Sequence, residues 1–135
     1  MQMSAKAFLD TNVPLYLLSE DQRKADISES LVSAGGVVSV QVLNEFASVA
    51  LRKHALSIDE VKTVLAAVRA NCEVVPLTIE THELGLRLVQ RYSFSLYDAM
   101  IVAAASLTGA TVLYSEDMQD GMAIEGGFKI SNPFR

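Results

Sequence analysis

Four acidic residues lie within or directly after strongly apolar segments of the chain: Asp10, Glu45, Asp98 and Asp117. Carboxylates that converge on one spot repel each other, so a bound cation would favour their charged forms. A ligand set made of oxygens, without His or Cys, selects hard ions such as Mg²⁺ or Mn²⁺. Two such ions can activate water and stabilise the leaving oxygen in phosphodiester cleavage. The four acids together therefore predict a metal-dependent nuclease.

Each acid taken alone has a simpler structural explanation. Asp10 could cap a short helix that follows it. Asp98 lies three residues after Ser95, which is the spacing of a capping box. Glu45 alone is typical of a helix surface, and Asp117 could belong to an ordinary solvated loop. The prediction therefore depends on the joint placement of the four acids, and on the apolar neighbours of Glu45 and Asp98, where a carboxylate needs a partner or a metal.

Short apolar runs alternate with amphipathic helical patterns along the chain. The predicted strands are 5–9, 37–40, 73–77, 111–114 and, as a weaker fifth, 129–131. The predicted helices are 13–18, 26–34, 41–54, 57–71, 81–92 and 95–107. The strands are continuously apolar, which is typical of a parallel sheet covered on both faces. The expected fold is therefore α/β, a three-layer α/β/α sandwich with a short central parallel sheet.

This fold also predicts where the acids meet. Ligands of such sheets bind at the carboxyl ends of the strands. Asp10 directly follows the first predicted strand, and Asp117 comes just after the fourth. The helices begin at the same edge, with Glu45 in the first half of one helix and Asp98 in the first turn of another. The four acids can thus converge although they are far apart in the sequence.

Composition limits the other classes of function. The chain has 135 residues, a net charge of −5 and one cysteine, Cys72. This length fits a single domain, residues 1–135, whose core needs no disulfide or structural zinc. No apolar run is long enough for a signal peptide or a membrane span, so a cytoplasmic location is expected. The negative charge weighs against binding nucleic acid by bulk charge, but it fits a site that holds cations.

Other catalytic chemistries find little support in the sequence. The two histidines, His54 and His82, fall at predicted helix-surface positions, and Cys72, expected to be a small buried hydrophobe near a helix end, has neither of them nearby in the sequence. There is no phosphate-binding glycine loop of the Walker or Rossmann type and no Gly-x-Ser-x-Gly turn. The acids are therefore the main candidates for chemistry.

Four motifs carry a resemblance to a known family: residues 8–12 (FLDTN), 44–46 (NEF), 97–101 (YDAMI) and 113–118 (LYSEDM). In this order and spacing they resemble the PIN-domain family, in particular the VapC-type toxin ribonucleases of toxin–antitoxin pairs, over nearly the whole chain. The resemblance implies a Mg²⁺- or Mn²⁺-dependent endoribonuclease with Asp10, Glu45, Asp98 and Asp117 as its metal-binding catalytic acids. It also implies supporting residues that orient those acids, namely Thr11, Asn12, Ser115 and, with a weaker match, Asp120.

The same resemblance implies partners and a reaction. Family members commonly form homodimers and are commonly silenced by an antitoxin protein that presents basic side chains to the acidic site. In the hypothetical mechanism, water attacks the phosphorus of RNA in line and the 3′ oxygen departs. Four basic residues are candidate phosphate contacts, and their alternative is a solvated helix surface: Arg52, Lys53, Arg87 and Arg91.

Two rival interpretations stay open at this point. A Mg²⁺-dependent phosphatase or phosphotransfer domain also places a nucleophilic Asp after a strand, but such phosphatases prefer a second Asp where this chain has Asn12, and Lys129 is poorly placed as their late lysine. A non-catalytic PIN module that only binds RNA or protein is the second rival. The presence of all four acids argues against it.

Overall fold

The centre of the molecule is a mostly parallel sheet. The computed structural model describes residues 6–135, and within them the strands pair in the order β3-β2-β1-β4-β6-β5. The strands are β1 (Ala7–Leu9), β2 (Val37–Ser39), β3 (Glu73–Val75), β4 (Val112–Tyr114), β5 (Ala123–Ile124) and β6 (Phe128–Ser131). Every neighbouring pair is parallel except β5 and β6, which are antiparallel.

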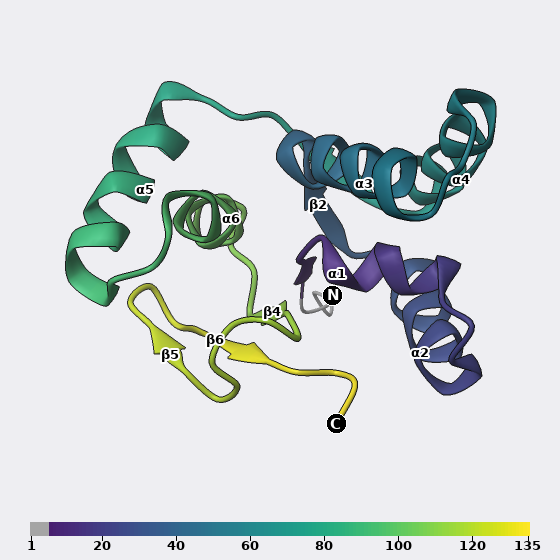
Figure 1. The fold of residues 1–135 in the computed structure, drawn as a ribbon. Coiled ribbons are helices and arrows are strands. Elements are labelled where there is room, and N and C mark those ends of the chain that lie inside the picture. Colours follow the sequence, from purple (N-terminus) through teal and green to yellow (C-terminus); the bar gives the residue numbers. More distant parts are fainter. Residues whose placement is uncertain (1–5) are drawn as a thin grey trace, which may run out of the picture.

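Helices cover both faces of this sheet. They are α1 (Asn12–Leu15), the 3-10 helix η1 (Tyr16–Leu18), α2 (Gln22–Ser33), α3 (Val40–Lys53), α4 (Ile58–Asn71), α5 (Ile79–Tyr92) and α6 (Leu96–Leu107). Helices α5 and α6 lie on one side of the sheet, and α1 to α4 lie on the other (Figure 1). The predicted three-layer α/β/α architecture is confirmed. No helix in residues 6–135 combines the length and the apolar character that crossing a membrane requires.

The central strands are short and buried on both faces. Phe8 and Leu9 follow each other in β1, so their side chains point to opposite faces, and both are fully buried. Leu113 in β4 and Ile130 in β6 are equally buried. This explains the continuous apolar runs in the sequence, because a strand between two helix layers has no solvent face to leave polar.

The register of the strands fixes the height of the candidate site. Leu9 pairs with Tyr114, and Tyr114 pairs with Ser131, so β1, β4 and β6 end at the same level. One residue further on, the amide of Asp10 still donates to the carbonyl of Tyr114 at 3.0 Å. The amide of Ser115 donates to the carbonyl of Ser131, also at 3.0 Å. Asp10 and Ser115 therefore lie side by side at the carboxyl edge of the sheet.

Several local predictions are confirmed. Ser57 and Glu60 form the predicted capping box at the start of α4, with both reciprocal hydrogen bonds present. The weak fifth strand exists as β6, and Cys72 is buried at the end of α4. Both His54 and His82 are exposed. The predicted helix over residues 13–18 is present as two short pieces, α1 and η1.

Other boundaries differ from the prediction, two of them because a side chain caps the helix that follows. Helix α2 begins at Gln22 rather than at residue 26, since Asp21 caps it by accepting from the amide of Lys24 at 3.2 Å. Strand β2 ends at Ser39, whose hydroxyl accepts from the amide of Val42 and begins α3. Strand β3 ends at Val75, two residues before the predicted end. Strand β5 was not predicted, and residue 5 of the first predicted strand lies outside the described residues.

Candidate active site at the carboxyl edge of the sheet

Asp10 is the buried centre of the candidate site. Its side chain is only 6% exposed, although it is a carboxylate. One oxygen, Oδ1, accepts from the amide of Thr11 at 2.7 Å. The other, Oδ2, accepts from the hydroxyl of Ser115 at 2.7 Å. These two bonds come from the ends of β1 and β4, so the sheet register itself sets the orientation of the carboxylate.

Asn12 and Ser115 connect Asp10 to Asp117. The side-chain amide of Asn12 donates to Asp10 Oδ2 at 3.3 Å and to Asp117 Oδ2 at 3.2 Å. The hydroxyl oxygen of Ser115 accepts from the backbone amides of Asp117 and Met118, each at 3.2 Å. Both residues therefore hold the loop after β4 against the start of α1, which places the exposed Asp117 beside the buried Asp10.

Burial and charge repulsion shift the titration of these acids. The pKa of Asp10 is raised from 3.8 to about 6, mainly by burial and further by the charges of Asp98 and Asp117, against the lowering effect of its hydrogen bonds. The pKa of Asp98 is also raised, first by its partial burial and then by Asp117, while Ser95 lowers it. Asp10, Asp98 and Asp117 are therefore close enough for their charges to repel each other, which the order of the residues in the sequence does not show.

The sequence left two explanations open for Asp98, a residue at a helix cap and an acid of the site. Asp98 lies in the first turn of α6, and its backbone amide donates to the hydroxyl of Ser95, the N-cap residue, at 3.2 Å. The helix therefore begins with the predicted Ser–Asp spacing. The same first turn faces the carboxyl edge of the sheet, and this is why Asp98 and Asp10 interact through their charges.

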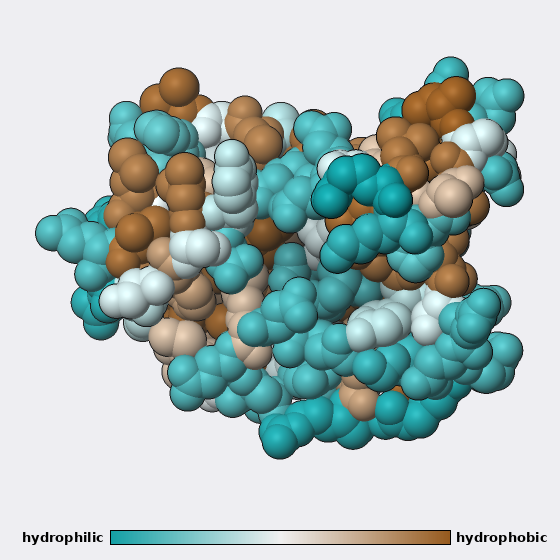
Figure 2. All heavy atoms as spheres, in the orientation of Figure 1, coloured by the Kyte–Doolittle hydropathy of each residue, from teal (hydrophilic) through white to brown (hydrophobic). Residues whose placement is uncertain are grey.

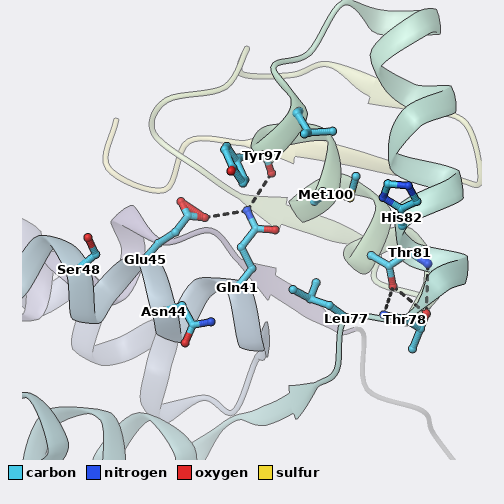
Figure 3. A pocket seen from close by; sticks show the side chains of 11 residues that line it. Gln41, Asn44, Glu45, Ser48, Leu77, Thr78, Thr81, His82, Tyr97 and Met100 are labelled. Carbon is cyan, nitrogen blue, oxygen red and sulfur yellow. Dashed lines mark hydrogen bonds between the residues drawn. The ribbon is translucent and has the colours of Figure 1, made fainter.

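Glu45 is placed differently from the other three acids. It lies on α3, where its carboxylate accepts from the side-chain amide of Gln41 at 2.8 Å. Gln41 also donates to the backbone carbonyl of Tyr97 at 3.0 Å, so Glu45 is tethered next to Asp98 through an intermediate side chain (Figure 3). Glu45 lines a groove of about 520 Å³ between α3 and the first turns of α5 and α6, together with Tyr97 and Met100.

The three aspartates and Glu45 are thus neighbours rather than one closed cluster. Among residues 6–135, no three Asp, Glu, His or Cys side chains are arranged as a ready-made metal cage. The donors nevertheless fit a hard divalent cation in kind, because they are all carboxylate oxygens whose mutual repulsion a cation would relieve. The hydroxyl of Thr11, next to Asp10, is buried without a hydrogen-bond partner among the described residues, which is typical of a site completed by water or a ligand.

The basic residues predicted as phosphate contacts divide into two groups. Arg52 and Lys53 are the last residues of α3, both exposed, and the next residue, His54, shares a cavity with Asn12 and Asp117. This end of α3 therefore lies near the cavity that Asp117 lines. Hydrophilic side chains surround the hollow below α3, whereas hydrophobic ones gather over α5 and α4 (Figure 2).

Arg87 and Arg91, the other two predicted phosphate contacts, lie away from the acidic edge. Both belong to α5 and pair with Glu125, at 3.7 Å and 3.3 Å. Glu125 lies in the turn between β5 and β6, before β6 begins, and therefore at the amino edge of the sheet. Both arginines are exposed, which is the placement expected from the alternative of a solvated helix surface.

Asp120 is engaged by the C-terminal segment. Its carboxylate accepts from the amide of Asn132 at 2.7 Å and pairs with Arg135 at 2.6 Å. These contacts lower the pKa of Asp120, the amide of Asn132 first and Arg135 next. In the described structure Asp120 therefore fastens the end of the chain, and the orientation of Asp10 and Asp117 is set by Asn12 and Ser115 instead.

Sequence reasoning missed three residues beside the site, Tyr16, Lys24 and Glu116. The carboxylate of Glu116 accepts from the hydroxyl of Tyr16 and from the ammonium of Lys24. Glu116 is 92 positions from Lys24 and 100 from Tyr16, so no local pattern could have predicted the cluster. Gln41 was missed as well, although its spacing of four residues before Glu45 was a usable signal.

Fold and site together define an α/β protein with neighbouring acids at the carboxyl edge of a mostly parallel sheet. The model of the PIN domain matches residues 7–122, and the chain therefore belongs to the PIN-domain family. No curated protein is similar enough in sequence to count as a match.

Solved structures support the same architecture. A toxin–antitoxin complex from Klebsiella pneumoniae is 23% identical, with 95% of this chain and 98% of that chain covered and a TM-score of 0.71. A DNA-bound VapBC from Salmonella typhimurium is 20% identical, covering 96% and 99%, with a TM-score of 0.69. VapC20 from Mycobacterium tuberculosis, described as a sarcin-ricin loop cleaving toxin, is 20% identical, covering 83% and 90%, with a TM-score of 0.67. At these identities the likeness concerns the fold.

Proposed function

We propose that this chain is a divalent-metal-dependent endoribonuclease and the toxin of a toxin–antitoxin pair. The observation that carries the proposal is the convergence of Asp10, Asp98 and Asp117 at the carboxyl edge, with Asp10 buried and its pKa raised to about 6. A buried acid that repels its neighbours is costly unless a cation is bound there, and perturbed acids cluster at functional sites. Membership of the PIN-domain family supports the same conclusion.

Mg²⁺ or Mn²⁺ would be held by Asp10, Asp98 and Asp117, with Glu45 as the fourth acid across from them. When bound, such ions supply an activated water and a charge that stabilises the leaving oxygen. The chain itself supplies orientation. Thr11 and Ser115 each donate a hydrogen bond to one oxygen of Asp10. The side-chain amide of Asn12 donates to both Asp10 and Asp117 and so keeps the two carboxylates next to each other. Arg52 and Lys53, at the neighbouring end of α3, would contact the RNA phosphates.

The proposed partners follow from the site and from its relatives. Several structural relatives are described as toxin–antitoxin or DNA-bound VapBC complexes. An antitoxin that presents Arg or Lys side chains would compete with cations for the acids of this chain, because opposite charges favour the ionised carboxylates. A homodimer and a cytoplasmic location, where RNA is available, belong to the same proposal.

The phosphatase alternative gains no support from the geometry. Lys129 is exposed and pairs with Val112, the first residue of β4, so it lies near the amino edge of the sheet. A phosphate bound at Asp10 would be at the opposite edge.

The proposal is tested by incubating the purified chain with a structured RNA substrate in Mn²⁺, in Mg²⁺ and in excess EDTA. Cleavage is expected with the metals and should be lost in EDTA and in Asp10→Asn. Full activity of Asp10→Asn, or full activity in EDTA, would refute the assignment. Binding of beryllofluoride at Asp10, detected by ¹⁹F NMR, would instead favour the phosphatase.

A further inference from the structure

We propose that Glu116 is a positioning residue, which holds the loop after β4 so that Asn12 and Asp117 face Asp10. The family resemblance selects Asp117 as an acid of the site and gives no role to its neighbour Glu116. The structure separates them, because the two carboxylates have different partners. The effect of Glu116 on cleavage rests on the proposed function, whereas its effect on the geometry does not.

The side chain of Glu116 ties its loop to two other elements. One carboxylate oxygen accepts from the hydroxyl of Tyr16 in η1, and the other accepts from Lys24 Nζ in α2 at 3.0 Å. Lys24 also donates to the Tyr16 hydroxyl at 3.2 Å and lies over its ring, 4.7 Å from the centroid. The ring of Tyr16 packs edge-on against Phe134, with 4.6 Å between centroids. Tyr16 and Lys24, the two partners of Glu116, are therefore themselves held in place by packing.

The backbone of Glu116 orients Asn12. Its amide donates to Asn12 Oδ1 at 3.2 Å. A carboxamide whose oxygen is fixed on one side must present its NH₂ group on the other side. In this structure that NH₂ group meets Asp10 and Asp117. A single residue thus fixes the loop through its side chain and the bridging amide through its backbone.

The charge of Glu116 is balanced within its own group of contacts. Both of its oxygens are occupied, and the ammonium of Lys24 balances its charge. Burial alone would raise the pKa of Glu116, but the bonds from Tyr16 and Lys24 and the charge of Lys24 outweigh it and hold the pKa below its ordinary value. Two hydrogen bonds and one ion pair therefore hold the side chain of Glu116, and with it the loop after β4.

The first test needs neither RNA nor metal. In ¹⁵N-labelled protein, the side-chain amide signals of Asn12 and the backbone amide signal of Asp117 are compared in the wild type, Glu116→Ala and Glu116→Gln. Glu116→Ala should move the Asn12 signals toward those of a solvated carboxamide, and Glu116→Gln, which can still accept from Lys24, should restore most of the original position. Unchanged Asn12 signals in Glu116→Ala would overturn the proposal.

Glu125→Ala is the matched control. Glu125 is likewise a glutamate paired with two basic side chains, but it lies at the opposite edge of the sheet. It should leave the Asn12 signals unchanged although it also removes ion pairs. An equal movement in Glu125→Ala would show a general loosening of the structure and would contradict a specific positioning role.

The second test measures RNA cleavage. Glu116→Ala should lower kcat by about 10- to 100-fold with KM changed less than about threefold, because misplaced catalytic groups slow the chemical step. Glu116→Gln should recover most of kcat. A raised KM with unchanged kcat would instead make Glu116 a substrate-binding residue and overturn the proposal. If the wild type itself does not cleave RNA, the proposed function fails, while the NMR comparison still decides the positioning role.

Discussion

Replacing Asp10 by asparagine should stabilise the metal-free protein at neutral pH, although Asp10 is the centre of the candidate site. The reason is the raised pKa of the buried carboxyl, which moves from 3.8 to about 6 through burial and the charges of Asp98 and Asp117. A folded state that holds its proton more tightly than the unfolded state becomes less stable as that proton is lost. An amide at this position has no proton to lose.

The sign and size of the effect follow from linkage. Between pH 3.8 and about 6 the folded chain binds a proton that the unfolded chain has released, so the free energy of unfolding falls as the pH rises through this window. Above it the full cost is present, about 3 kcal/mol at 1.36 kcal/mol per pH unit. Asp10 is only 6% exposed, so solvent screening removes little of this. Asparagine loses one acceptor oxygen, which offsets about 1 kcal/mol.

The assay is urea denaturation in EDTA at pH 4 and pH 7.5. Asp10→Asn should be more stable than the wild type by about 2 kcal/mol at pH 7.5, and this advantage should disappear at pH 4. Asp26→Asn, at an exposed position in α2, should show no such pH-dependent difference. A destabilised Asp10→Asn at pH 7.5, or an equal difference at both pH values, would refute the reasoning.

Three further predictions concern the loop, the basic residues and the sheet. Asn12→Ala should lower the cleavage rate by about 10- to 100-fold, because it removes the amide that joins Asp10 to Asp117; unchanged single-turnover rates would contradict this. Arg52→Gln should raise KM for RNA while Arg87→Gln, at the amino edge, should not, and equal effects on the two KM values would show that the placement is wrong. Gly36→Ala should lower the unfolding free energy by about 1–3 kcal/mol in urea denaturation, since a Cβ there would lie 2.8 Å from the carbonyl oxygen of Ala7; a neutral effect would contradict it.

The parts of the site that lie at strand ends were predictable from the sequence. The apolar run before Asp10 and the one before Ser115 each mark a buried strand, and parallel strands end at a common edge. The general fold followed from the same alternation of apolar runs and helical patterns. Strand β5 escaped prediction because two residues carry no periodic signal of their own, and they form a strand only by pairing with β6.

The contacts across the site could not be predicted in this way. Glu116 contacts Lys24 because η1 and α2 fold back toward the end of β4. The spacing of residues within a short segment of the sequence cannot predict this contact. Arg87, Arg91 and Arg52 are all arginines on predicted helix surfaces, so the sequence does not separate them. In the structure, Arg87 and Arg91 on α5 pair with Glu125 at the amino edge of the sheet. The sequence gives the sign of each surface charge, whereas the partner of that charge depends on how the helices pack.

The chemical ends of the RNA products test the central claim most directly. If the acids of the carboxyl edge direct water at the phosphorus and the 3′ oxygen departs, mass spectrometry should find a 5′-phosphate and a 3′-hydroxyl at every cut. A 2′-deoxy substitution at the cleaved nucleotide should then leave the rate unchanged. Products with a 2′,3′-cyclic phosphate and a 5′-hydroxyl would show attack by the ribose 2′-hydroxyl and would contradict the account.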